Sequence, residues 1–281
     1  MKVLTVLRKI ASTPQGAFGL GVLILFFSTA IVVGIDPAVV GYNAFAFHPK
    51  SDLAPPSLQN PFGADNFGRS VFSQVLRSMP LDAFISLSVV GVSVFVGGLL
   101  GAVAGYFGGV VEDITMRTTD LFLAFPAAVL TIAVATALGP GALNAMVALM
   151  VVNWTTYARL ARGDTLSLRG KAFVMAAQIN GKGAFFILRK HVLPNIVPSL
   201  LAIATVGTGA VMITFSVLGY LGLGAQPPSI ELGMLVYQGQ SFLRSAPWYP
   251  LIPGATILVV TMAFAFVGDS IREVLLPSSS S

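Results

Sequence analysis

The sequence contains no cysteine, and only 10% of its 281 residues are charged. The absence of cysteine excludes disulfide bonds and thiolate metal sites. Soluble domains carry about 25% charged residues, because their surfaces face water. Here 55% of the residues are hydrophobic and the mean hydropathy is +0.85, so most of the surface must face an apolar solvent. The composition therefore predicts an integral membrane protein.

Long apolar runs dominate the chain. A helix needs about 20 apolar residues to cross ~30 Å of hydrocarbon. Six runs qualify, and none contains Asp, Glu, Lys or Arg. They cover residues 16–35, 83–104, 121–138, 141–158, 196–218 and 251–267. We predict an all-α polytopic membrane protein with six transmembrane helices. Pro126 and Pro253 are expected in the first turns of their helices, where a missing N–H costs little.

Basic residues predict the orientation. Lys2, Arg8 and Lys9 precede the first run, which we interpret as an uncleaved helix because no Ala-x-Ala cleavage site follows it. The segment after the fourth run holds Arg159, Arg162, Arg169, Lys171, Lys182, Arg189 and Lys190. Cytoplasmic loops carry such an excess of positive charge. We therefore expect a multi-pass protein of the cell membrane with both termini cytoplasmic. The expected parts are a cytoplasmic N-terminus 1–15, extracytoplasmic segments 36–82 and 219–250, and a cytoplasmic segment 163–195.

Several kinds of chemistry are missing. Ion-coupled carriers place ionisable groups within their spans, whereas Asp120 and Asp269 lie at span ends, where an interfacial role is expected. His48 and His191 lie outside the spans, so neither serves as a base at mid-membrane. The chain has no phosphate-binding loop of the Gly-x-x-x-x-Gly-Lys-[Ser/Thr] type and no metal-ligand spacing. Energy for any work must therefore enter from another polypeptide.

Three glycines repeat at every fourth position of the second run. Gly97, Gly101 and Gly105 form a doubled small-xxx-small pattern on one helical face. Such a face lets a neighbouring helix approach closely. We predict a helix-packing role for these three residues, although glycines scattered through a Gly-rich membrane helix are the alternative.

The stretch from Arg169 to Pro194 differs from its surroundings in being both basic and apolar. Lys171 to Ile179 suits a short helix, and Asn180-Gly181 suits a left-handed stop. A second short helix is expected over Ala184–His191 and is expected to end before Pro194.

Four residues of the first short helix share one face by their spacing: Phe173, Ala176, Ala177 and Asn180. Small side chains on this face would let the helix sit deep in a groove of a partner. We interpret the segment as a docking element. A helix lying on anionic lipid is the alternative that the residues alone leave open.

At these residues the chain resembles a family. The segment is similar to the cytoplasmic coupling motif of binding-protein-dependent ABC importer permeases, Glu-Ala-Ala-x3-Gly-x9-Ile-x-Leu-Pro. The matching residues are Ala176, Ala177, Gly181, Leu193 and Pro194. Met175 replaces the Glu and His191 replaces the Ile.

The resemblance extends along nearly the whole chain. It points to the dipeptide/oligopeptide/nickel permeases, and to the second, C-type subunit of their permease pairs. The stretches that carry it are Phe62–Ser73, Ala104–Gly109, Asp120–Pro126, Trp154–Arg162, Leu218–Pro228, Ser245–Trp248 and Gly268–Arg272. The chain departs from relatives at Glu231-Leu232, where a tryptophan usually precedes Gly233.

The resemblance implies a type I ABC importer permease with a core over 83–281. It implies a homologous permease subunit, two ATPase subunits and an extracytoplasmic substrate-binding protein as partners, besides membrane lipid. ATP and Mg²⁺ would bind to the ATPases, with no cofactor on this chain. The substrate class would be dipeptides, oligopeptides, nickel chelates or oligosaccharides. A secondary carrier or channel independent of ATP, and a membrane-embedded enzyme or scaffold, are the alternatives.

The outer segments carry a separate hypothesis. Residues 219–250 contain the aromatic residues Tyr237, Phe242, Trp248 and Tyr249. We expect this partly re-entrant segment and residues 36–82 to form the docking floor for the binding protein, with ordinary loop packing as the alternative. Asp65 and Arg69 are expected to form a helical ion pair with a local role.

Overall fold

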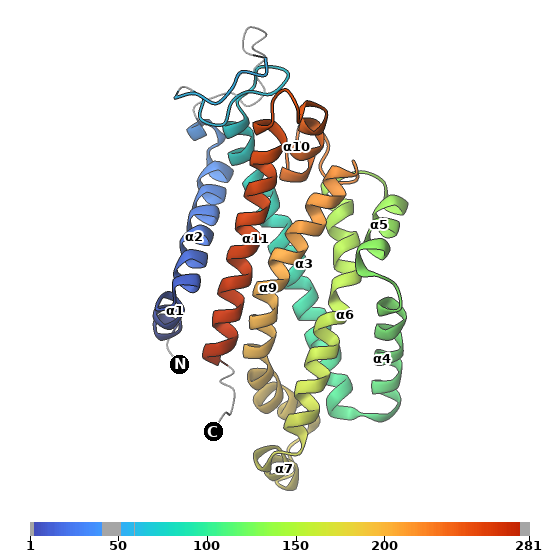
Figure 1. Cartoon of the computed structure of the whole chain (residues 1–281). Coiled ribbons are helices and arrows are strands. Elements are labelled where there is room, and N and C mark those ends of the chain that lie inside the picture. Colours follow the sequence, from blue (N-terminus) through green and yellow to red (C-terminus); the bar gives the residue numbers. More distant parts are fainter. Residues whose placement is uncertain (1–2, 41–51, 59, 276–281) are drawn as a thin grey trace.

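The computed structural model describes residues 3–40, 52–58 and 60–275. Five long helices run along one axis (Figure 1). They are α2 (Pro14–Ile35), α3 (Val71–Phe107), α6 (Ala142–Arg169), α9 (Leu193–Tyr220) and α11 (Trp248–Leu275). The shorter helices are α1 (Val3–Ala11), η1 (Pro37–Val40), α4 (Gly109–Leu123), α5 (Ala127–Leu138), α7 (Ala172–Ile179), α8 (Ala184–Ile187), η3 (Leu188–Val192), α10 (Leu232–Gly239) and η4 (Gln240–Phe242).

The two ends of the bundle are distinct. α1, α7 and the C-terminal end of α11 lie at one end, which is the lower end in Figure 1. α10 lies at the opposite, upper end. Both ends of the described chain therefore share a side with α7, as the predicted orientation requires.

Helix starts follow local chemistry. Thr13 caps α2 by accepting a hydrogen bond from the Gly16 N–H (3.1 Å), and Pro14 occupies the first turn, where no N–H is needed. Ser70 caps α3 by accepting from the Ser73 N–H (3.4 Å). As a result α3 begins at Val71, earlier than the 83 predicted from hydropathy, and the end of the predicted outer segment 36–82 is helical.

The all-α prediction agrees with the structure, but six spans are not confirmed. Among the described residues, four helices are long and apolar enough to cross a membrane: Pro14–Ile35, Val71–Phe107, Ala184–Tyr220 and Trp248–Val274. A bent pair of helices, α4 and α5, brings the number to five at most. α6 is long enough, but Asn144, Asn153 and Arg159 lower its hydropathy.

The third predicted span, 121–138, is wrong as a single helix. α4 ends at Leu123, α5 begins at Ala127, and their axes differ by 87°. Pro126 precedes α5 with φ −55° and ψ 124°, instead of lying inside a first turn. Its ring disfavours helical backbone at the preceding residue, which explains the break. Pro253 lies inside α11, which begins at Trp248.

α3 and α6 approach each other at the glycine stripe. A Cβ at Gly97 would overlap the carbonyl oxygen of Trp154, and one at Gly101 would overlap that of Ala158. A Cβ at Gly105 would lie 2.8 Å from the Arg162 oxygen. Only residues without a side chain permit this approach.

Candidate functional site

The segment 163–195 at the lower end begins on α6, which continues to Arg169. α7 follows an extended Lys171 (φ −76°, ψ 143°). It ends where Gly181 adopts φ +72° and the Lys182 N–H donates to the Ala177 oxygen (3.1 Å). The predicted helix and its left-handed glycine stop are confirmed.

The second helix of the segment does not end before Pro194. α8, a π-helical turn over Leu188–Val192 and α9 follow one another without a break, and together they form one helix from Ala184 to Tyr220. Pro194 lies in the first turn of α9. In a regular α-helix the Pro194 ring would clash with the carbonyl group of the residue four positions before it. The wider π turn leaves room for this ring. The segment is therefore directly continuous with a long helix of the bundle.

α7 presents two faces. Val174 and Ala177 are buried in the same apolar core as α3, α6 and α9. Phe173, Ala176 and Asn180 are exposed. The prediction that Ala177 shares the outward face is wrong, because its methyl group packs against the bundle and anchors α7 there.

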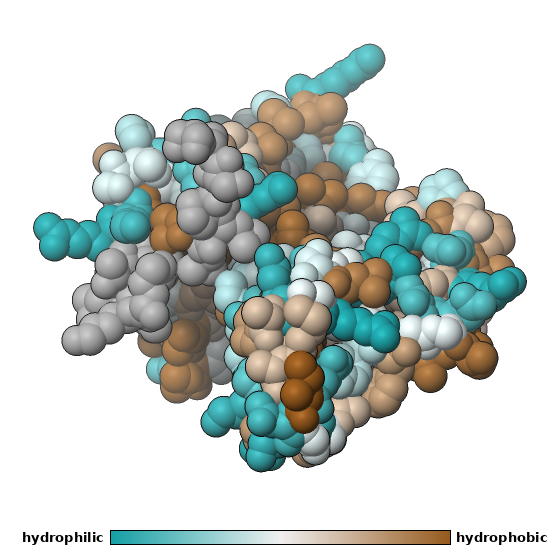
Figure 2. All heavy atoms as spheres, turned by 90° about the horizontal axis from the view of Figure 1, so that it is seen from below, coloured by the Kyte–Doolittle hydropathy of each residue, from teal (hydrophilic) through white to brown (hydrophobic). Residues whose placement is uncertain are grey.

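The outward side of this segment is apolar and basic at once. Ile179 is 86% exposed and Phe185 76% exposed. Further exposed apolar residues are Phe173, Met175 and Phe186, and exposed basic residues are Lys171, Lys182, Arg189 and Lys190. Figure 2 views the molecule from this end, where tan and brown atoms lie among teal ones. So much exposed apolar surface around a helix of only eight residues is unfavourable in water and marks an interaction surface.

His191 occupies the position where the resemblance leads us to expect Ile. Its ring centroid lies 6.0 Å from that of Phe173 and 5.8 Å from that of Phe186. The imidazole thus lies beside aromatic rings of both α7 and α8. Leu193 is half-buried and Pro194 is exposed just beyond it.

Two of the sequence stretches meet between α4 and α6. Asp120 Oδ1 accepts a hydrogen bond from Arg159 Nη2 (2.6 Å), and the Phe122 and Trp154 rings pack edge to face at 5.8 Å. Arg162 forms a second ion pair, with Glu112. Sequence reasoning placed Asp120 at an interface and missed these pairs. The sequence did contain a signal for them, because one stretch holds Asp120 and the other holds Arg159 and Arg162.

At the upper end Asp65 organises a loop. Its Oδ1 accepts the N–H groups of Phe67 and Arg69, both at 2.8 Å, and its Oδ2 accepts from Arg69 Nε (2.6 Å) and Gln74 Nε2 (3.0 Å). The carboxylate is fully buried. The expected Asp65–Arg69 ion pair is present, but the expectation that it is helical is wrong, since residues 64–70 form a turn closed by a bridge between Ala64 and Ser70.

The four aromatic residues predicted for docking do not form one surface. Tyr249 is fully buried, with its hydroxyl donating to Gln238 Oε1 (3.3 Å), so it offers nothing to a docked protein. Trp248 is half-buried and donates its indole N–H to the Ala64 oxygen (3.2 Å). Phe242 stacks on Tyr249, whereas Tyr237 is 50% exposed. Tyr249 is therefore withdrawn from the predicted docking set.

Glu231 is a buried acid that sequence reasoning treated as part of a loop. It caps α10 by accepting the N–H groups of Gly233 and Met234, both at 2.7 Å. Gly219 and Gly224 leave room for its carboxylate. Burial raises the pKa of Glu231 to about 7, although the two N–H donors act to lower it. Leu232 next to it is fully buried and donates its N–H to Asp82 Oδ2 (3.2 Å).

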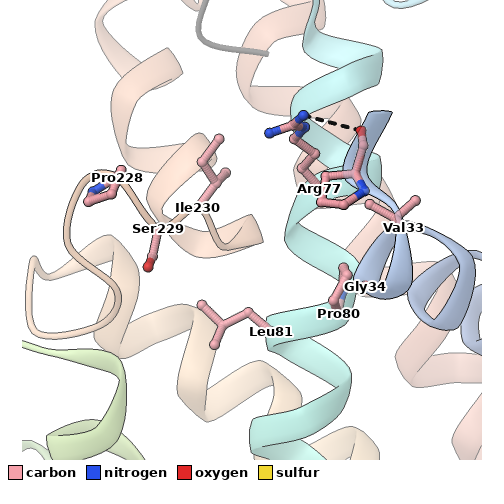
Figure 3. Close-up of a pocket in the computed structure, with 9 residues that line it drawn as sticks. Val33, Gly34, Arg77, Pro80, Leu81, Pro228, Ser229 and Ile230 are labelled. Carbon is pink, nitrogen blue, oxygen red and sulfur yellow. Dashed lines mark hydrogen bonds between the residues drawn. The ribbon is translucent and has the colours of Figure 1, made fainter. Parts of the chain in front are cut away.

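The same loop separates two cavities at the upper end. One, of about 310 Å³, lies between Pro228–Ile230 on one side and residues of α2 and α3 on the other (Figure 3). Arg77 lines it and donates to the Pro37 oxygen (3.2 Å). The other, of about 390 Å³, includes Arg69 and Gln74. Over the described ranges, no group of three or more His, Cys, Asp or Glu side chains is placed to hold a metal ion.

The sequence matches a family model described as binding-protein-dependent transport system inner membrane component, over residues 97–280. It is 34% identical to the dipeptide transport system permease protein DppC of Alkalihalophilus pseudofirmus, over 92% of this chain and 85% of that protein. It is 39% identical to the probable D,D-dipeptide transport system permease protein DdpC of Escherichia coli, over 87% of this chain and 82% of that protein.

The nickel transport system permease protein NikC of Escherichia coli is 30% identical, over 91% of this chain and 92% of that protein. Among solved structures, a chain of the MetNI methionine ABC transporter in inward-facing conformations has a similar fold, with a TM-score of 0.57 and 20% identity. The similarity covers 73% of this chain and 97% of that one, and it concerns the fold alone.

Proposed function

The chain belongs to the family of binding-protein-dependent transport system inner membrane components, and from this premise we propose that it is the transmembrane permease subunit of an ATP-driven importer for peptides or related small solutes. Relatives named for dipeptide and D,D-dipeptide transport support the peptide class. A relative named for nickel transport is the reason that related small solutes are included. No relative reported above is named as an ATP-independent carrier or as an enzyme.

The observation that carries the proposal is the outward side of segment 163–195. It is exposed, basic and apolar, and it is held by Val174 and Ala177 to the core of the bundle. Phe173, Ala176 and Asn180 give this surface a bulky, a small and a polar side chain. Such an uneven surface fits a groove on a protein. Gly181 supplies the turn, and Leu193 and Pro194 join the segment to α9.

Force transmission follows from the continuity of α8, η3 and α9. A displacement of the docked segment acts on one continuous helix from Ala184 to Tyr220. Because a packed helix moves as a unit, this displacement changes the position of α9 in the bundle. ATP binding and hydrolysis on the partner ATPases, where ATP and Mg²⁺ bind, would in this way switch the bundle between inward- and outward-open states.

The full assembly follows from the same premise. This chain is the second of two homologous permease subunits of type I architecture with six spans. Two ATPase subunits lie below the pair, on the side of α7 and α8, and a binding protein docks at the upper end. Both termini and segment 163–195 face the cytoplasm, which their shared end supports. Tyr237 is the exposed aromatic residue offered to the binding protein, with Phe242 and Trp248 supporting the loops beneath it.

Reconstitution tests this function. The complete complex in proteoliposomes should accumulate radiolabelled dialanine, of L,L or D,D configuration, only with binding protein and ATP present. Ile179→Arg should reduce co-purification of the ATPase subunits, because it places a charge on the apolar docking side. Leu58→Arg, a matched change at an exposed apolar residue outside this segment, should leave co-purification intact. Uptake that continues without ATP would establish a secondary carrier instead.

A further inference from the structure

A cavity of about 300 Å³ with a mixed polar and apolar lining lies between α6, α9 and α11. α6 contributes Asn153, Thr156 and Tyr157, and the C-terminal part of α11 contributes Asp269 and Arg272. The α9 wall consists of small and apolar residues. α6 and α11 both end at the lower end of the bundle, so the two charges lie toward that end.

Most of the polar side chains that line this cavity make no hydrogen bond or ion pair with other described residues. Within the described part of the chain, the carboxylate of Asp269, the guanidinium of Arg272 and the hydroxyl of Thr156 have no hydrogen-bond or ion-pair partner. Asn153 donates its amide N–H to the Leu149 oxygen (2.8 Å), which leaves its side-chain oxygen available. The side chains of Asp269, Arg272 and Thr156 are exposed, so water or a polar solute that enters the cavity can be their partner.

Two glycines determine the shape of the cavity. A Cβ at Gly268 would overlap the Val206 side chain, so α11 contacts α9 closely at the residue before Asp269. A Cβ at Gly207 would overlap the hydroxyl of Tyr157, so that hydroxyl reaches the backbone of α9. The Gly268–Arg272 stretch therefore combines a close helix contact with two charges that line one cavity.

We propose that this cavity is a transient subsite for the transported peptide, in which Asp269 receives the free ammonium group and Arg272 the free carboxylate. This inference rests on the proposed function and adds a substrate site on this chain. Opposite charges three residues apart lie about 5–6 Å apart at their Cβ atoms. An extended dipeptide spans about 7 Å, so both side chains reach its termini.

The remaining groups fit the middle of such a peptide. The Asn153 oxygen accepts from the peptide N–H, and the Thr156 hydroxyl donates to the peptide oxygen. The planar guanidinium of Arg272 suits a carboxylate, which it binds through two parallel N–H donors. A volume of about 300 Å³ is at the small end of ligand cavities, which favours a dipeptide over long oligopeptides.

The natural absence of cysteine provides a direct test. Thr156→Cys places a single thiol in the cavity, and Thr118→Cys on α4 places the matched thiol at an exposed position outside it. The complete complex with binding protein is reconstituted, and maleimide labelling of this chain is timed during ATP turnover. Dialanine should slow labelling at position 156 several-fold and leave position 118 unchanged.

A second set of variants tests the charges. Arg272→Gln should abolish protection by dialanine, Arg272→Lys should restore part of it, and a dialanine with an amidated carboxyl terminus should protect poorly in the native background. ATP hydrolysis, followed in parallel, reports that the variants still assemble.

Three results overturn the inference, and they are distinguishable. Unchanged labelling at position 156 while ATP-driven dialanine uptake continues removes the subsite and leaves the proposed function standing. Failure of the complex to take up dialanine of either configuration removes the peptide function and the subsite with it. If labelling at position 156 is slowed by phosphatidylethanolamine in the liposomes and is unaffected by dialanine, the cavity binds a zwitterionic lipid headgroup instead.

Discussion

The carboxylate of Asp120 on α4 and the guanidinium of Arg159 on α6 lie 2.6 Å apart. The pair joins two of the sequence stretches that carry the family resemblance, Asp120–Pro126 and Trp154–Arg162. Together with the Glu112–Arg162 pair, it attaches the lower arm of the bent α4–α5 unit to the helix that leads into α7. α4 is therefore placed to follow any movement of segment 163–195.

The Asp120–Arg159 pair should contribute little to stability. Its side chains are 65% and 57% exposed, so solvent screens the attraction. A double-mutant cycle with Asp120→Asn and Arg159→Gln should give a coupling energy below roughly 1 kcal/mol, decreasing with added NaCl. The less exposed Glu112–Arg162 pair, measured with Glu112→Gln and Arg162→Gln, should give the larger coupling. The opposite ranking would contradict this account of α4 attachment.

The glycine stripe predicts a strong effect of added volume. Gly101→Leu should lower the unfolding free energy by about 1–3 kcal/mol or more, since its side chain would force α3 away from α6. Gly91→Leu is the matched control, because a Cβ there meets no atom within 4 Å. Thermal unfolding of the purified complex measures both. Equal stability of the two variants would show that α3 and α6 do not pack as described.

Removal of the Asp65 carboxylate should disorder the upper loop. Asp65→Ala deprives two backbone N–H groups, Arg69 and Gln74 of their acceptor, at a cost of about 1–3 kcal/mol for buried groups left unsatisfied. Asp52→Ala, at an exposed acid of the same region, should be neutral. Hydrogen exchange over residues 60–74 is the readout. Protection that survives in Asp65→Ala would refute the role of this carboxylate.

Glu231 predicts a pH dependence of the upper end. Burial raises its pKa from 4.5 to about 7, so the folded state holds a proton that the unfolded state releases above pH 4.5. The stabilisation is therefore present at low pH and is lost as pH rises through about 7. Hydrogen exchange of α10 should become faster over this interval. Glu231→Gln should flatten the profile, and an unchanged slope in that variant would assign the titration to another group.

Local sequence signals predicted local features well. Gly181 and Asn180 predicted the end of α7 because a left-handed glycine stop depends only on neighbouring residues. The repeat of Gly97, Gly101 and Gly105 predicted a face, although not which helix would meet it. Apolar runs predicted the long helices, because burial in lipid depends on average composition over a whole helix.

Features that depend on distant contacts were missed. The break at Pro126 lies in an uninterrupted apolar run, so hydropathy carries no sign of the 87° change in direction. Tyr249 is buried because α10 and the upper loop cover it, and its residue type is equally suited to a surface. Glu231 and Asp65 are buried although both are charged residues next to loop segments, and no charge pattern indicates this burial.

Chemical cross-linking tests most directly the central claim, that α7 carries force from partner ATPases to α9. Ala176→Cys and Tyr237→Cys place single thiols at exposed positions on opposite ends of the chain. In membranes that hold the complete complex, a short thiol–amine cross-linker should join position 176 to an ATPase subunit, with a yield that changes on addition of ATP. Position 237 should give no ATPase product. Cross-linking of the ATPase to position 237, or a position 176 that meets only lipid, would contradict the account.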